Sequence, residues 1–123
     1  MTTPEPKRIL IADDDVKLRT MLGLMLTGEG YEVAHAISGK EAAALHRQKP
    51  FDLAITELGL DSFSALMELR RPPSPAKFIA ISETSWTSDE VCLRMGEHLG
   101  AHCVLAKPFT MEQLLQAVHE ALA

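Results

Sequence analysis

The chain has 123 residues, with 12 Lys and Arg against 17 Asp and Glu, and a formal net charge of −5. A chain of this length can bury a core without disulfides. Residues 1–123 are therefore predicted to form a single domain, of which residues 1–6 are a flexible leader. The acidic balance argues against direct nucleic-acid binding. No apolar run approaches the roughly 20 residues of a membrane span. Cys92 and Cys103 lack a C-x-x-C spacing, which favours reduced thiols and a cytoplasmic location.

Short apolar runs alternate with helical apolar stripes along the chain. Residues 8–12 form a nearly continuous apolar run, typical of a strand covered on both faces. A helix that ends near Gly28 and Gly30 follows, with a core-facing stripe formed by Leu18, Met21, Leu22, Met25 and Leu26. The same alternation predicts strands over 31–36, 52–56, 78–82 and 102–106, and helices after Ser38 and over 62–71, 87–99 and 110–122.

Strands that alternate with helices predict an α/β domain with a doubly wound parallel sheet. Two capping boxes support the helix starts, one formed by Ser38 with Glu41 and one by Thr110 with Gln113. In such sheets, ligands bind beyond the carboxyl ends of the strands. The residues that end or follow each strand are therefore the candidates for function.

Charged and hydroxyl side chains occupy these strand ends. Asp13 and Asp14 follow the first predicted strand, Glu57 follows the third, Ser82 ends the fourth and Lys107 follows the fifth. Clustered carboxylates stay ionised only if a cation or an ammonium group compensates them, and Mg²⁺ is a hard cation that suits oxygen ligands. Together these groups can hold a phosphoryl group.

Asp15 and the histidines are predicted to have structural or surface positions and no part in the site. Asp15 is predicted only to stabilise the start of the following helix through the helix dipole. The five histidines show no metal-ligand spacing, and all are predicted to lie on the surface.

Four segments, in this order, resemble the receiver domain of two-component response regulators: KRILIADDD, FDLAITE, IAIS and GAHCVLAKPF. The resemblance implies a flavodoxin-like sheet of five parallel strands in the order 2-1-3-4-5, with five helices. It assigns Asp13 and Asp14 to a metal-binding pocket and Ser82 to the switch hydroxyl. It assigns Lys107 to pairing with a phosphate or carboxylate, and it allows a cis bond between Lys107 and Pro108.

The sequence departs from the family pattern at the site itself. Glu57 stands where the family carries its phosphoacceptor aspartate, and its extra methylene moves the carboxylate by about 1.5 Å. Because in-line transfer tolerates little misplacement, phosphorylation is predicted to be inefficient. The interval from Glu57 to Ser82 is 25 residues, a few short of the family. Glu83 replaces a small residue, and Val104 stands where the family has an aromatic switch residue.

These departures predict a pseudo-receiver that is not an enzyme and acts by protein–protein interaction. Glu57 either imitates a phosphorylated aspartate or forms a fixed salt bridge with Lys107, and Mg²⁺ binding stays open. The resemblance implies a histidine kinase, a downstream regulator or a second copy as partner. The expected contact face combines the 87–99 helix, the 102–106 strand and the 110–122 helix.

In the functions that are alternatives to a pseudo-receiver, the pocket at the strand ends is still active. One is a phosphate-accepting, Mg²⁺-dependent receiver, against which Glu57 argues. Another is a haloacid-dehalogenase-like phosphohydrolase, which Asp13 and Asp15 fit superficially, but Lys17 stands where that family has Thr or Val, and no acidic pair follows Lys107. A flavodoxin-like cofactor binder would need a phosphate loop after the first strand. A chain that ends on its last predicted helix fits either a stand-alone regulator or a domain of a longer protein.

Overall fold

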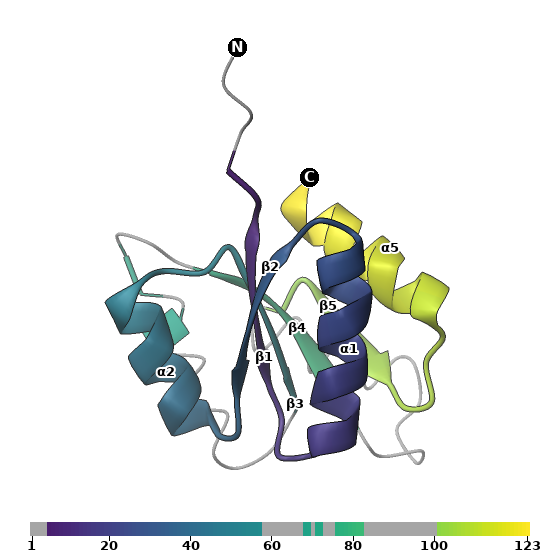
Figure 1. Cartoon of the computed structure of the whole chain (residues 1–123), viewed down its shortest axis with the longest axis horizontal. Helices are drawn as coiled ribbons and strands as arrows, with labels where there is room; N and C mark the ends of the chain where they lie inside the picture. The colour runs from purple at the N-terminus through teal and green to yellow at the C-terminus, as the bar shows by residue number, and fades with distance from the viewer. Residues whose placement is uncertain (1–4, 58–67, 70, 73–75, 83–100) are drawn as a thin grey trace.

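The computed structural model describes residues 5–57, 68–69, 71–72, 76–82 and 101–123. Within these residues, five strands form one parallel sheet in the order β2-β1-β3-β4-β5 (Figure 1), which confirms the predicted order. The strands are β1 (Arg8–Ala12), β2 (Glu32–Ala36), β3 (Leu53–Glu57), β4 (Lys77–Ser82) and β5 (Cys103–Ala106).

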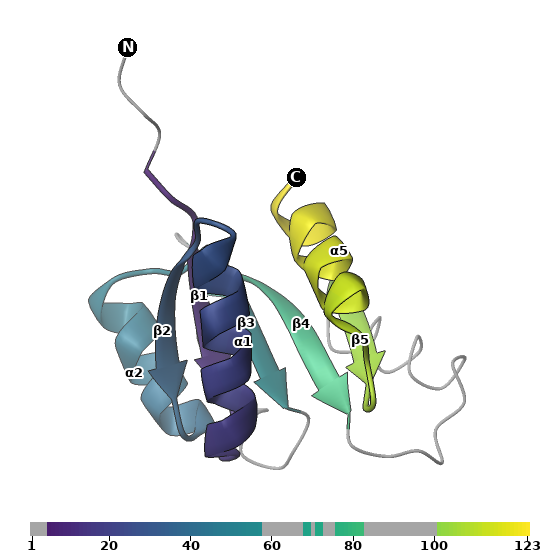
Figure 2. The same ribbon diagram turned by 45° about the vertical axis from the view of Figure 1, so that its right-hand side comes forward.

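Helices cover both faces of the sheet. The described helices are α1 (Val16–Gly28), α2 (Gly39–Gln48) and α5 (Met111–Leu122). Helices α1 and α5 lie on one face and α2 on the other (Figures 1 and 2). The helix predicted over 87–99 and nearly all of the one predicted over 62–71 lie outside the described residues. No helix in the described part of the chain is long and apolar enough to cross a membrane.

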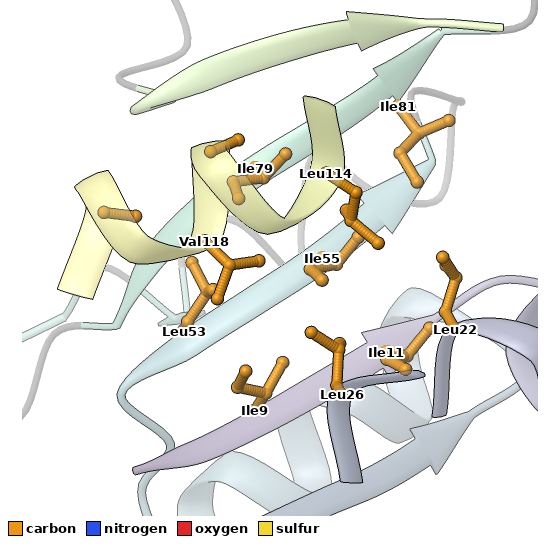
Figure 3. Packing of buried hydrophobic residues seen from close by; sticks show 12 residues of the cluster. Ile9, Ile11, Leu22, Leu26, Leu53, Ile55, Ile79, Ile81, Leu114 and Val118 are labelled. Atoms are coloured by element: carbon orange, nitrogen blue, oxygen red, sulfur yellow. The ribbon is translucent and has the colours of Figure 1, made fainter. Parts of the chain in front are cut away.

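The continuous apolar run in β1 is explained by burial on both sides. Ile9 and Ile11 belong to the core cluster under α1 and α5, whereas Leu10 and Ala12 belong to the cluster on the face that α2 covers. Figure 3 shows Leu114 and Val118 of α5 packed into the first cluster. The central strands therefore need apolar residues at every position, because both faces are covered.

Ser38 and Thr110 are the N-caps of α2 and α5, as predicted, and both bonds of the predicted capping box are present at Thr110. Ser38 Oγ accepts a hydrogen bond from the Glu41 N–H at 3.1 Å. At α5, the Gln113 N–H donates to Thr110 Oγ1 at 3.1 Å and the Thr110 N–H donates to Gln113 Oε1 at 2.8 Å, which completes a capping box. These bonds satisfy amide groups that have no partner within the helix.

One histidine contradicts the prediction that all five lie on the surface. His46 is only 5% exposed, its Nδ1 accepts a hydrogen bond from the Phe51 N–H at 3.1 Å, and the two rings stack with their centroids 6.3 Å apart. His46 instead closes the turn from α2 to β3, because its ring supplies the acceptor that the buried Phe51 amide requires.

Two glycines near the end of α1, Gly28 and Gly30, should respond oppositely in stability when each is replaced by alanine. Gly30 has a φ of 94°, so Gly30→Ala should lower the free energy of unfolding by about 1–2 kcal/mol. Gly28 is helical, and an added Cβ there meets no atom within 4 Å, so Gly28→Ala should raise it by about 0.5–1 kcal/mol. Urea unfolding of both variants measures the two shifts, and shifts of equal sign would contradict this account of the helix end.

Candidate functional site

The candidate residues meet because their strands are neighbours in the sheet. Ala12 of β1 and Thr56 of β3 are register partners, so Asp13 and Glu57 are level, one residue further along. At the other side of β4, the Lys107 N–H donates to the Ser82 carbonyl oxygen at 2.8 Å. The carboxyl ends of β1, β3, β4 and β5 lie along one edge of the sheet (Figure 2), so these residues follow or end neighbouring strands at that edge.

Three carboxylates form the centre of this edge. Asp13, Asp14 and Glu57 each place one carboxylate oxygen within 4.8 Å of the others. Asp13 is buried at 5% exposure, Glu57 is half-buried and Asp14 is exposed. Carboxylates at this separation repel each other unless a positive charge compensates them. The arrangement therefore needs a cation or an ammonium group.

The two oxygens of Asp13 have different surroundings. Oδ1 accepts a hydrogen bond from the Asp15 N–H at 2.8 Å, whereas Oδ2 is buried and has no hydrogen-bond partner among the described residues. A buried carboxylate oxygen without a partner is costly, and a hard divalent cation such as Mg²⁺ satisfies such an oxygen directly. The three carboxylates and this oxygen therefore fit a divalent cation.

Asp15 connects this cluster to α1. Its Oδ1 accepts hydrogen bonds from the Lys17 N–H at 3.0 Å and the Leu18 N–H at 3.2 Å, which makes Asp15 the N-cap of the helix. Only a dipole effect was predicted for Asp15 from the sequence, so both the cap and the bond to Asp13 were missed. A local signal existed, because an acidic residue directly before a helical apolar stripe is a favoured N-cap.

A pocket of about 370 Å³ opens beside the charged edge, lined by Leu18, Met21, Lys107, Pro108 and Phe109. The Lys107–Pro108 peptide bond is cis, as the family resemblance allowed. Met21 is 52% exposed, so its predicted place in the core was wrong. The pocket gives the charged edge an apolar border between α1 and the segment that follows β5.

The remaining candidates are Ser82, Val104 and Glu83. Ser82 is buried at 6% exposure at the end of β4. Val104 is half-buried, pairs in register with Ala80 and packs against the core cluster on the face that α2 covers. Glu83 lies outside the described residues, as does most of the segment between Glu57 and Ser82. Position 104 thus carries a small aliphatic side chain that packs against the core.

Comparisons with known proteins agree with this architecture. The family model for the response regulator receiver domain matches residues 9–119. A protein described as a probable chemotaxis protein CheY from Rhizobium etli is 30% identical over 122 residues, which cover 96% of this chain and 94% of that protein. The structure of chemotaxis protein CheY4 from Vibrio cholerae has a TM-score of 0.82 at 28% identity, and the match covers 95% of this chain and 99% of that one.

Longer regulators also match over most of this chain. The transcriptional regulatory protein ZraR of Salmonella typhimurium is 36% identical over 118 residues, and GlrR of Escherichia coli is 31% identical over 121 residues. These matches cover 94% and 96% of this chain, which spans only 26% of ZraR and 27% of GlrR. The strand order, the residues at the strand ends and the match over residues 9–119 lead to one assignment. The chain belongs to the response regulator receiver domain family.

Proposed function

We propose that this domain is a pseudo-receiver of two-component signal transduction, which acts through protein–protein contact and is not phosphorylated at residue 57. The observation that carries the proposal is the position of Glu57, whose carboxylate lies within the acidic cluster where the family has its phosphoacceptor aspartate. Glutamate keeps the negative charge of aspartate but adds a methylene. The cluster keeps its charge, and the reacting oxygen moves.

The displacement is large on the scale of phosphoryl transfer. One methylene moves the carboxylate by about 1.5 Å, and a misplacement of about 1 Å can reduce a rate by roughly 100-fold. The attacking oxygen must also lie in line with the leaving group and at the correct distance from the phosphorus, and the longer side chain of Glu57 changes this position. Glu57 therefore opposes phosphorylation.

Val104 supports the loss of the phosphorylation-dependent switch. In the family, an aromatic side chain at this position responds to the switch hydroxyl, here Ser82. The half-buried Val104 packs against the core cluster on the face that α2 covers, and a valine has no ring to change orientation. A phosphoryl group at the site would then lack the usual means of changing the surface.

The cation and the ammonium group have separate proposed roles. Asp13, Asp14 and Glu57 would hold Mg²⁺, which would supply positive charge to the three carboxylates. Lys107 is the proposed salt-bridge partner of Glu57. We favour this fixed pair over imitation of a phosphorylated aspartate, because one carboxylate carries less charge than the roughly −1.5 to −2 of a phosphoryl group.

The proposed partner is a protein, either a histidine kinase, a downstream regulator or a second copy of the domain. The proposed contact face combines β5 and α5 with the predicted 87–99 helix. The relatives in the comparisons are transcriptional regulatory proteins and a chemotaxis protein, and this range of proteins is consistent with a signalling role in the cytoplasm. The domain itself is proposed to catalyse no reaction.

Incubation of the wild-type chain with acetyl phosphate and Mg²⁺, followed by intact-mass measurement, tests this proposal. We expect no phosphoryl adduct, because Glu57 displaces the accepting oxygen. Addition of one phosphoryl group per chain would overturn the pseudo-receiver and favour the phosphate-accepting receiver. Catalytic release of phosphate without a stable adduct would favour a phosphohydrolase.

A further inference from the structure

One residue, Asp15, bonds in both directions along the chain. Its backbone N–H donates to Asp13 Oδ1 at 2.8 Å, and its own Oδ1 accepts hydrogen bonds from the Lys17 and Leu18 amides. The first bond holds a buried carboxylate in the acidic cluster, and the other two hold the first turn of α1. Asp15 thus connects the orientation of Asp13 to a helix that is packed on the sheet.

The bond to Oδ1 determines what the other oxygen of Asp13 can do. With Oδ1 occupied, Oδ2 is the oxygen that has no hydrogen-bond partner among the described residues, although the atom is buried and Asp13 as a whole is only 5% exposed. A carboxylate with one oxygen fixed by an amide and the other directed to a cation is the arrangement in which outer-shell hydrogen bonds orient metal ligands. Asp14 lies between Asp13 and Asp15 in the chain, and hydrogen bonds hold both of these neighbours in place.

We infer that Asp15 is a positioning residue for the divalent-cation site, because its N-cap keeps its own N–H on Asp13 Oδ1 and so leaves Oδ2 for the cation. This inference rests on the cation site of the proposed function. It assigns to Asp15 a role through geometry, whereas its negative charge alone would act only through the electrostatic field. The two roles separate when the capping oxygen is kept and the charge is removed.

Titration of the folded chain with Mg²⁺ by calorimetry in 0.3 M KCl tests the inference, because salt screens the charge of the exposed Asp15 side chain. Asp15→Ala removes the cap and should weaken Mg²⁺ binding by roughly 10-fold, the lower range for loss of an outer-shell partner. Asp15→Asn keeps a capping oxygen and should stay within about 3-fold of the wild type, which is the effect that a screened charge alone would have.

Ser38→Ala and Thr110→Ala are matched controls, because Ser38 and Thr110 are the N-caps of α2 and α5. Each should cost stability similar to Asp15→Ala, about 1 kcal/mol, and should leave Mg²⁺ affinity unchanged. Urea unfolding of all four variants measures the stability.

Three results would overturn the inference. Equal weakening by Asp15→Asn and Asp15→Ala would assign the effect to charge. Equal weakening by all three alanine variants would assign it to general destabilisation. Absence of Mg²⁺ binding by the wild type would remove the cation site itself. The phosphodonor experiment on Glu57 gives its result independently of this series, so failure of the positioning role is distinguishable from failure of the pseudo-receiver.

Discussion

A Glu57→Asp variant should accept one phosphoryl group per chain from acetyl phosphate in the presence of Mg²⁺. The substitution withdraws the carboxylate by about 1.5 Å and leaves Asp13 and Asp14, the other two members of the acidic cluster, in place. Because position controls in-line transfer, this single change should restore the accepting geometry. Intact-mass measurement should find one added phosphoryl group on the variant and none on the wild type.

Two controls define the meaning of that result. Glu57→Gln keeps the length of glutamate without its charge and should remain unmodified, as should Glu57→Asp in the presence of a chelator of Mg²⁺. An unmodified Glu57→Asp variant would contradict the view that residue 57 alone prevents phosphorylation. The absence of phosphorylation would then be due to the remaining departures from the family pattern, which are Glu83, the short segment before Ser82 and Val104.

An Arg8→Ala variant should lose about 2–3 kcal/mol of unfolding free energy, because several charge-assisted contacts disappear together. The Arg8 guanidinium pairs with Glu32 Oε2 at 2.8 Å, donates to the Lys49 and Pro50 carbonyl oxygens at 2.8 and 2.7 Å, and lies 4.2 Å from the centre of the Phe51 ring. The side chain is only 18% exposed. Urea unfolding followed by circular dichroism measures the loss.

Arg71 is the matched control for Arg8. Its guanidinium lies 3.9 Å from Glu68 Oε1 and its side chain is 75% exposed, so Arg71→Ala should change stability by less than about 0.5 kcal/mol. Arg8→Lys keeps the charge but cannot reproduce the planar fork, and its stability should lie between those of Arg8→Ala and the wild type. Equal urea midpoints for Arg8→Ala and Arg71→Ala would show that the Arg8 contacts add no net stability.

The sheet could be predicted from sequence because its central strands are buried on both faces. Apolar residues at every position from Ile9 to Ala12 leave no polar face, which excludes a strand with one side in water. The alternation of such runs with helical stripes then determines parallel pairing. Helix ends were predictable where a capping side chain is local, as at Thr110.

The site could be predicted only in part. A strand-end rule is sufficient to bring Asp13 and Glu57 to one edge, because parallel strands end together. The rule cannot determine which oxygen of Asp13 accepts a hydrogen bond from a backbone N–H, because this depends on the backbone path through Asp15. The burial of His46 was unpredictable for a similar reason, because the sequence of α2 gives no sign that the Phe51 amide needs an acceptor.

The length of β1 separates the Arg8 contacts from the acidic cluster. Arg8 begins the strand and Asp13 follows it, a distance of roughly 16 Å at about 3.3 Å per residue. Substitutions more than about 7–10 Å apart without shared partners are usually additive in free energy. Residues of the acidic edge can therefore be exchanged while the Arg8 contacts continue to stabilise the fold, so a substitution at residue 57 need not cause a general loss of stability.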